Sequence, residues 1–222
     1  MTGTLSETTM QRDLICKVGK SIFERGLTAG STGNISVRLG DGTVLMTPTN
    51  ASLGDLDPER LSLVSADGSH LSGDKPTKEA FLHRCMYCER DADHAVVHLH
   101  STNAVAVSIL RDVDAADVLP PLTAYYVMRV GRLPLVPYFA PGDEALALAV
   151  KERAGAHHAV LLANHGPVVS GATLREAQYA VEELEETARL HLLLQGRETR
   201  PLTDAQAAPL RKSPASRVSS GA

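Results

Sequence analysis

The sequence predicts an α/β fold in which a mixed sheet is covered by helices on both faces. Segments with the helical spacing of apolar residues alternate along the chain with short apolar runs that are typical of strands. A hairpin is also predicted early in the chain, where two strands flank a glycine-rich turn. The chain has 222 residues, of which 43% are hydrophobic. We therefore expect one globular domain over residues 1–206.

The first element is predicted to be an amphipathic helix over Thr8–Arg25, because its apolar residues form one stripe. Thr8 and Gln11 have the spacing of a capping box, and Gly26 supplies the C-terminal stop. The remaining elements are predicted from the helical spacing of apolar residues and from short apolar runs that are typical of strands. Strands are expected at residues 35–39, 43–47, 61–64, 95–100, 133–138 and 159–163. Further helices are expected after Thr77, over Thr102–Leu110, after the cap Asp143, and from the capping box of Thr173 and Glu176 to Gly196.

Two other segments lack these spacings. Residues 119–126, around Pro120 and Pro121, are interpreted as a loop. Residues 207–222 are rich in Ser, Ala, Pro and Arg, so a disordered C-terminal tail is predicted there.

Composition excludes several classes of function. No run approaches the roughly 18 consecutive apolar residues that a membrane span requires. The net charge of −4 argues against a nucleic-acid partner. Residues 1–12 lack the pattern of a signal peptide, and the three cysteines suit a reducing compartment, so a cytoplasmic location is expected. Cys85 and Cys88 form a CxxC within a predicted helix, and we interpret them as packing thiols.

Three histidines are placed to bind one metal ion. His98 and His100 lie two residues apart on a predicted strand, so both imidazoles point to the same face. His165 follows a second apolar strand, at an end of the sheet where sites are commonly built. Three neutral histidines with an open fourth position are typical of a catalytic zinc site. On the spacing alone, separate hydrogen-bonded histidines are an equally good interpretation. His70, His83, His94, His157, His158 and His191 show no such placement.

Three loops carry donors that suit an anion. Residues 30–34 combine flexible backbone amides with hydroxyl and amide side chains, and residues 47–50 add further hydroxyls. Thr77 and Lys78 begin a helix, whose free N–H groups favour an anion. Each loop taken alone is better explained as a turn or a helix cap than as an anion site.

Five motifs together resemble one family. GSTGNIS, TPTNASLG, GDKPTKE, HLHS and NHGPVV occur in this order, and the chain resembles the class II aldolase and adducin-head family from about Leu14 to Leu194. That resemblance implies a three-layer α/β/α sandwich with a central mixed, largely antiparallel sheet. KPTKE, HLHS and PPLTAYYVMRVGRLPLVPY are most similar to the branch of 3-oxo-tetronate 4-phosphate decarboxylases.

The resemblance also implies roles for individual residues. Zinc would be bound by His98, His100 and His165, and Glu79 would act as the acid/base carboxylate and join the metal ligands when the site is empty. Lys78 stands where many aldolases carry a small hydroxyl residue, and a cation there would suit a substrate that bears a carboxylate. The expected phosphate contacts are Ser31, Asn34, Thr49, Asn50 and Thr77.

The expected reaction is therefore zinc-dependent decarboxylation of 3-oxo-tetronate 4-phosphate to dihydroxyacetone phosphate and CO2 through a metal-stabilised enediolate. The alternatives are a fuculose-phosphate aldolase, a ribulose-phosphate 4-epimerase and a non-catalytic adducin-like scaffold. The family also implies a homotetramer in which a tyrosine reaches a neighbouring site. Tyr125 and Tyr126 are both candidates, and packing of the aromatic pair is an equal alternative.

Overall fold

A computed structural model describes residues 6–140 and 143–211 of the chain. One eight-stranded sheet runs through it in the order β4-β3-β2-β1-β5-β8-β7-β6, and every neighbouring pair is antiparallel except β6 and β7. The strands are β1 Asn34–Arg38, β2 Val44–Met46, β3 Ser62–Val64, β4 His70–Ser72, β5 Ala95–His98, β6 Leu135–Val136, β7 Ala159–Leu162 and β8 Gly166–Gly171. The predicted mixed, largely antiparallel sheet is confirmed.

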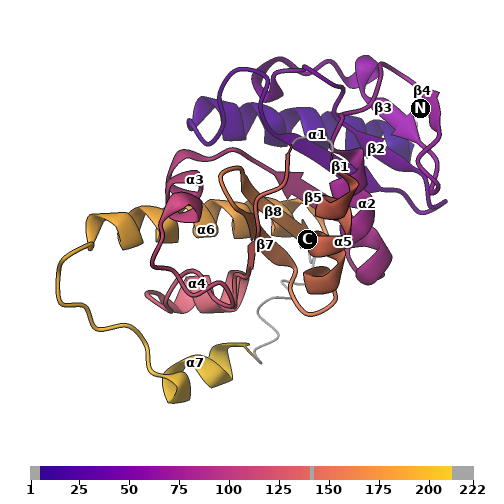
Figure 1. The fold of residues 1–222 in the computed structure, drawn as a ribbon. Coiled ribbons are helices and arrows are strands. Elements are labelled where there is room, and N and C mark those ends of the chain that lie inside the picture. The colour runs from indigo at the N-terminus through magenta and orange to yellow at the C-terminus, as the bar shows by residue number, and fades with distance from the viewer. Residues whose placement is uncertain (1–5, 141–142, 212–222) are drawn as a thin grey trace.

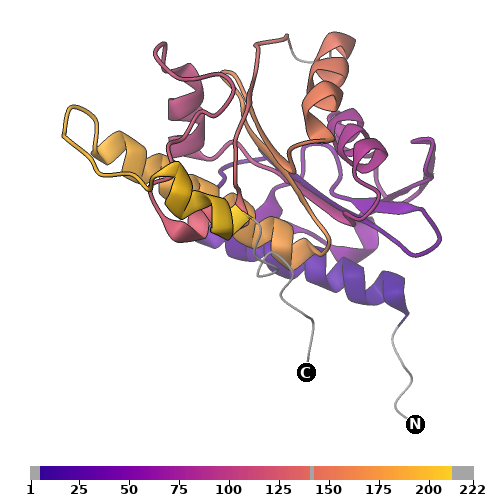
Figure 2. The ribbon, with the colours of Figure 1, turned by 90° about the horizontal axis from the view of Figure 1, so that it is seen from below.

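Helices cover both faces of this sheet (Figure 1). The helices α1 and α6 lie side by side on one face, and α2 and α5 lie on the other (Figure 2). The α-helices are α1 Glu7–Glu24, α2 Ala80–Glu89, α3 Thr102–Ile109, α4 Ala124–Arg129, α5 Glu144–Ala154, α6 Leu174–Leu193 and α7 Asp204–Arg211, and two short 3-10 helices cover Leu53–Asp55 and Pro58–Arg60. This is the predicted three-layer arrangement.

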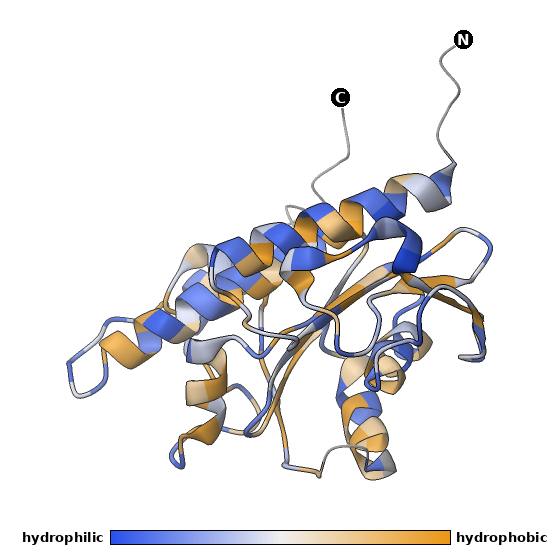
Figure 3. Ribbon diagram, turned by 90° about the horizontal axis from the view of Figure 1, so that it is seen from above, coloured by the Kyte–Doolittle hydropathy of each residue, from blue (hydrophilic) through white to orange (hydrophobic). Residues whose placement is uncertain are grey.

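The buried side chains form two hydrophobic cores, one on each face of the sheet. Successive residues of β5 point to opposite faces, so Val97 packs into the core shared with α1, α3, α4, α6 and α7. Val96 packs into the second core, between the sheet and the helices α2 and α5. The middle of the sheet is mostly hydrophobic, whereas α1 and α6 alternate between hydrophobic and hydrophilic residues (Figure 3). His98 lies two residues after Val96, so its side chain points to the same face of the sheet, toward α2.

Several boundaries differ from the sequence-based expectation. The N-cap of α1 is Ser6, whose hydroxyl accepts a hydrogen bond from the Thr9 N–H at 3.2 Å, so the capping box assigned to Thr8 was wrong. Gly26 follows the helix with φ = 72°, as expected for a C-terminal stop. The segment interpreted as a loop contains α4, whose N-cap Thr123 accepts from the Tyr126 N–H.

Besides α4, two strands and a second helix were missing from the expected elements. The strand β4 forms a hairpin with β3 across a turn. The strand β8 is central and entirely buried, but Gly166 and Pro167 at its start are poor strand formers. Residues 207–211, which the sequence assigned to a tail, belong to α7, and Ala207 is buried in the first core. The rest of the expected tail lies outside the described residues. Among the described residues, no helix combines the length and the apolar character that crossing a bilayer requires.

Candidate active site

Two of the three predicted metal ligands come from the end of β5. His98 is its last residue and is fully buried, and its Nδ1 lies 2.8 Å from the backbone oxygen of Pro167. A carbonyl oxygen only accepts, so Nδ1 is the donor and carries the proton. The Nε2 of His98 therefore keeps a free lone pair. His100 lies two residues further along the chain, on the same side.

The third ligand is carried by the tight connection between β7 and β8. His165 lies between Asn164, which has φ = 57°, and Gly166, which has φ = 150°. The Asn164 N–H donates to the Ser108 hydroxyl at 3.0 Å and so fixes the start of this turn. A Cβ atom on Gly166 would lie 2.1 Å from the backbone oxygen of Leu99. The turn that carries His165 thus packs directly against the backbone that joins His98 to His100.

This close approach makes Gly166 sensitive to substitution. Gly166→Ala is expected to lower the free energy of unfolding by about 2–4 kcal/mol, because it combines a strained φ with a backbone clash. Gly42→Ala is the matched control, since Gly42 has φ = 84° but no atom within 4 Å of the added Cβ. Urea denaturation of the metal-free variants measures both losses. Equal losses in the two variants would contradict the packing role of Gly166.

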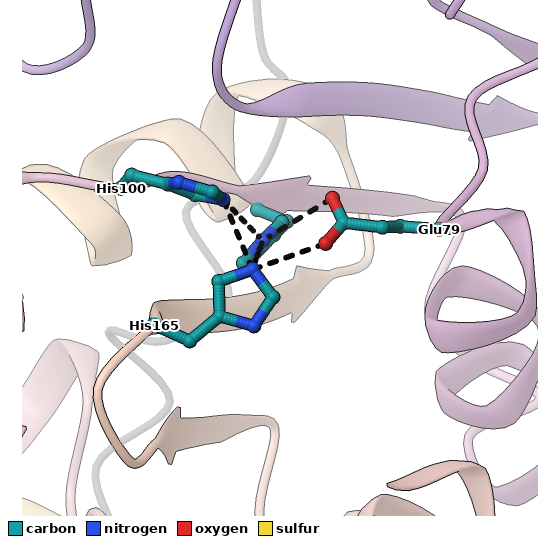
Figure 4. Close-up of side chains that lie close together, drawn as sticks. Glu79, His100 and His165 are labelled. Atoms are coloured by element: carbon teal, nitrogen blue, oxygen red, sulfur yellow. Dashed lines mark hydrogen bonds and ion pairs between the residues drawn. The ribbon is translucent and has the colours of Figure 1, made fainter. Parts of the chain in front are cut away.

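The three imidazoles converge on one point (Figure 4). The Nε2 of His98 lies 3.3 Å from that of His165 and 3.2 Å from that of His100, and the last two atoms are 3.0 Å apart. Three nitrogens that each lie about 2.0–2.1 Å from a tetrahedral zinc ion are separated from one another by about 3.3–3.4 Å. The observed separations are close to these values, so the three residues fit one divalent cation.

Glu79 completes the cluster from the beginning of α2. It is the N-cap residue of this helix, and its Oε1 lies 3.0 Å from the Nε2 of His165, while its Oε2 lies 3.5 Å from the Nε2 of His98. The four ligand atoms of Glu79, His98, His100 and His165 all lie within 4.8 Å of one another. The structure therefore brings together every metal ligand that the sequence predicted.

Burial and the contacts among these side chains together determine the charge of the cluster. Burial lowers the pKa of His98 to about 3, and it also lowers the pKa of His100, so both rings are neutral at pH 7. Burial by itself would raise the pKa of Glu79. The contacts of this carboxylate with His165, His98 and Asn34 outweigh burial and lower the pKa below its ordinary value. Neutral imidazoles and an ionised carboxylate form the donor set that a divalent cation such as zinc accepts.

The cluster lies at the edge of a cleft of about 400 Å³. The loop of residues 47–50 and the loop of residues 75–79 are joined there by backbone hydrogen bonds, from the Thr49 N–H to the oxygen of Lys75 and from the Thr77 N–H to the oxygen of Thr47. Phe81, Phe139 and Leu146 add an apolar wall that the sequence analysis did not predict. All six predicted substrate contacts line this cleft, namely Ser31, Asn34, Thr49, Asn50, Thr77 and Lys78.

Asn34 has partners within the protein that the sequence did not reveal. Its Nδ2 donates to the Oε2 of Glu79 at 2.7 Å, and its Oδ1 accepts from the Nε2 of His83. Both ends of the side-chain amide are therefore engaged within the protein. His83 was left out of the sequence-based site, because only its spacing of four residues from Glu79 pointed to it.

The two candidate tyrosines lie in different environments. Tyr126 is fully buried in the core, whereas Tyr125 is 62% exposed on the same helix, α4. Tyr125 is therefore the member of the pair that is accessible at the surface. It lines a surface groove of about 440 Å³ together with Arg25, Arg129 and Glu182.

Comparison with known proteins agrees with this geometry. The family model described as "Class II Aldolase and Adducin N-terminal domain" matches residues 13–192. The chain is 50% identical over 200 residues to the 3-oxo-tetronate 4-phosphate decarboxylase of Escherichia coli K12, covering 90% of this chain and 94% of that protein. It is 32% identical over 184 residues to the L-fuculose phosphate aldolase of Methanocaldococcus jannaschii, covering 83% of this chain and 97% of the relative.

A solved structure gives the same result. The crystal structure of YgbL from Escherichia coli, described as a putative aldolase/epimerase/decarboxylase, superposes with a TM-score of 0.91 at 48% sequence identity. The match covers 93% of this chain and all of that one. Similarity of fold and similarity of sequence thus each extend over about nine tenths of the chain.

Proposed function

This chain belongs to the class II aldolase and adducin family, and on that premise we infer that it is a lyase that decarboxylates 3-oxo-tetronate 4-phosphate to dihydroxyacetone phosphate. The observation that carries the inference is the convergence of three Nε2 atoms beside one carboxylate, in a cleft lined by hydroxyl and amide groups. Sequence identity favours decarboxylation over aldol cleavage, because it is 50% to the decarboxylase and 32% to the aldolase.

We propose zinc as the metal, bound by His98, His100 and His165. Three neutral imidazoles with an open fourth position form the donor set of catalytic zinc sites. The bound ion would supply a Lewis acid for the negative charge that remains on the substrate when CO2 leaves. The proton on the Nδ1 of His98 supports this assignment, because it keeps the Nε2 lone pair free and is held by the oxygen of Pro167.

Glu79 is the proposed general acid. Loss of CO2 leaves an electron pair on C2 of the substrate, and a proton must be added there to give the product. Glu79 is the only carboxylate among the described residues that line the cleft. Because its contacts with His165, His98 and Asn34 lower the pKa of Glu79, the carboxylate must first be protonated from solvent before it transfers that proton to C2.

The loops around the cleft are proposed to bind the two ends of the substrate. Ser31, Thr49, Asn50 and Thr77 offer hydroxyl and amide groups for the phosphate, and the beginning of α2 favours an anion. Lys78 is exposed beside them and is proposed to bind the carboxylate that is lost. Holding both ends of the substrate fixes the orientation of the C1–C2 bond relative to the C3 carbonyl. The electron pair of the breaking bond can then pass into that carbonyl.

The role of Lys78 predicts a selective loss of binding. Lys78→Ser is expected to raise KM about tenfold, which corresponds to one lost charged contact of about 1.4 kcal/mol. The Ki of dihydroxyacetone phosphate as a product inhibitor should not change, because the product lacks the carboxylate. Lys75→Ser is the control, since Lys75 is an exposed lysine in the same loop. An equal rise of KM and Ki would assign Lys78 to the phosphate and contradict this role.

A comparison of substrates tests the reaction. Initial rates with 3-oxo-tetronate 4-phosphate, fuculose 1-phosphate and ribulose 5-phosphate are measured with the zinc-loaded protein. We expect kcat/KM to be highest for the first substrate by at least two orders of magnitude. A higher value for fuculose 1-phosphate would favour the aldolase, and a higher value for ribulose 5-phosphate would favour the epimerase. No turnover of any of the three would favour the scaffold.

The oligomeric state and the cellular location of the enzyme are also part of the proposal. We propose a homotetramer, as the family resemblance implies, in which Tyr125 reaches a neighbouring subunit; its exposure and the groove beside it support this. Light scattering of the purified protein tests the assembly, and a monomer would contradict it. We propose a cytoplasmic location, which the free thiols of Cys16, Cys85 and Cys88 support.

A further inference from the structure

A buried row of polar side chains leads away from Glu79 between α2 and β1. Glu79, His83 and Tyr87 recur every four residues and so lie on one face of the helix. Asn34 and Ser36 are two residues apart on β1 and share the face of the sheet that α2 covers. The side chains from the strand alternate with those from the helix along this row.

Four hydrogen bonds connect the row. The Oη of Tyr87 lies 2.7 Å from the Oγ of Ser36, which lies 2.7 Å from the Nδ1 of His83. The Nε2 of His83 is bonded to the Oδ1 of Asn34, and the Nδ2 of Asn34 donates to the Oε2 of Glu79 at 2.7 Å. Ser36 and His83 are fully buried, and Asn34 and Tyr87 are at most 5% exposed.

The donor and the acceptor of every hydrogen bond in the row follow from the bond at Glu79. A carboxylate oxygen only accepts, so the NH2 group of Asn34 faces Glu79 and its Oδ1 faces His83. Because this oxygen also only accepts, the Nε2 of His83 must carry the ring proton. The Nδ1 of the neutral ring then accepts from the Ser36 hydroxyl, which accepts in turn from Tyr87. Burial supports a neutral ring, since it lowers the pKa of His83 to about 4.

We propose that His83 is a positioning residue for the reaction: its Nε2–H holds the Asn34 amide in the single orientation that donates to Glu79. Without this bond, the amide could turn over and present its oxygen to the carboxylate, which would repel it. The rotamer of Glu79 beside the three histidines would then no longer be fixed. A buried polar row that served stability alone could be replaced by apolar packing at little cost. This inference rests on the proposed role of Glu79.

Two substitutions of equal length separate positioning from packing. His83→Gln keeps one acceptor and one donor at a spacing similar to that of the imidazole, whereas His83→Met fills the space without a donor. We expect kcat to fall about 10–100-fold in His83→Met and to stay within about threefold of the wild type in His83→Gln. KM and zinc content should remain within about twofold in both variants. Equal kcat values for the two variants would overturn the proposal.

The tautomer of His83 can be measured in the wild-type protein without an activity assay. This measurement does not depend on whether a variant folds. Nitrogen-15 NMR of the metal-free wild type reports which ring nitrogen carries the proton. We expect His83 as the Nε2–H tautomer, and an Nδ1–H tautomer would overturn the proposal. A wild type with the Nε2–H tautomer but no decarboxylase activity would contradict the proposed function while still supporting the direction of the hydrogen-bond row.

Discussion

Glu79→Gln is expected to lower kcat at least about 100-fold while KM stays within about threefold. General acid catalysis contributes about 10²–10⁴-fold to a rate, and the amide cannot donate a proton to carbon as a carboxylic acid does. The substitution preserves size, and the new amide oxygen can still accept from the Nδ2 of Asn34. Steady-state kinetics with 3-oxo-tetronate 4-phosphate at a fixed zinc concentration measures this loss.

The control for this substitution is Glu59→Gln. Glu59 is exposed on a short 3-10 helix and does not line the cleft, so its variant should keep the wild-type kcat. Zinc content is measured in parallel, because Glu79 lies within reach of the metal position. A Glu79→Gln enzyme with zinc bound and kcat within threefold of the wild type would remove Glu79 from its proposed role.

Removal of the metal is expected to abolish activity. Dialysis against a chelator should lower kcat/KM more than 100-fold, and one equivalent of zinc per chain should restore it. Lys78, the one lysine or arginine among the described residues that line the cleft, is assigned to the carboxylate and not to the reacting carbonyl. Zinc should also raise the melting temperature of the wild type, since it binds the folded chain. Metal analysis and thermal denaturation measure these two effects.

His98→Ala tests the same centre through one ligand. Removing a neighbour of a metal ligand costs about 10–100-fold in affinity, and removing a ligand itself should cost more. His191→Ala is the control, because His191 lies on α6 outside the cleft. If the His98 variant loses stability through the cavity it leaves, His100→Ala provides a second, less buried ligand. Wild-type zinc affinity in either ligand variant would contradict the assignment.

The sequence predicted the parts of the site that depend on local spacing. Alternation along a strand places His98 and His100 on one side, and an apolar strand before His165 predicts its position at a strand end. The roles of Glu79 and of the phosphate-binding loops came from the family resemblance. The structure brings His165 to the other two rings through the approach of Gly166 to Leu99. That contact joins segments that are far apart in the sequence, so no pattern of neighbouring residues predicts it.

The elements and contacts that the sequence did not predict have identifiable physical causes. The strand β8 begins with Gly166 and Pro167, and only its burial between β5 and β7 makes this segment a strand. The helix α4 is short and follows two prolines, so its apolar spacing is too brief to detect. The partner of His83 is Asn34, on a strand rather than on its own helix, so spacing along the chain could not identify it.

The fate of the substrate carboxyl carbon tests the account most directly. The zinc-loaded protein is incubated with 3-oxo-tetronate 4-phosphate that carries carbon-13 at C1, and the products are followed by NMR. We predict that the label appears only as CO2 and bicarbonate, in a 1:1 ratio to unlabelled dihydroxyacetone phosphate. Label that remains in an organic product while the substrate is consumed would contradict decarboxylation.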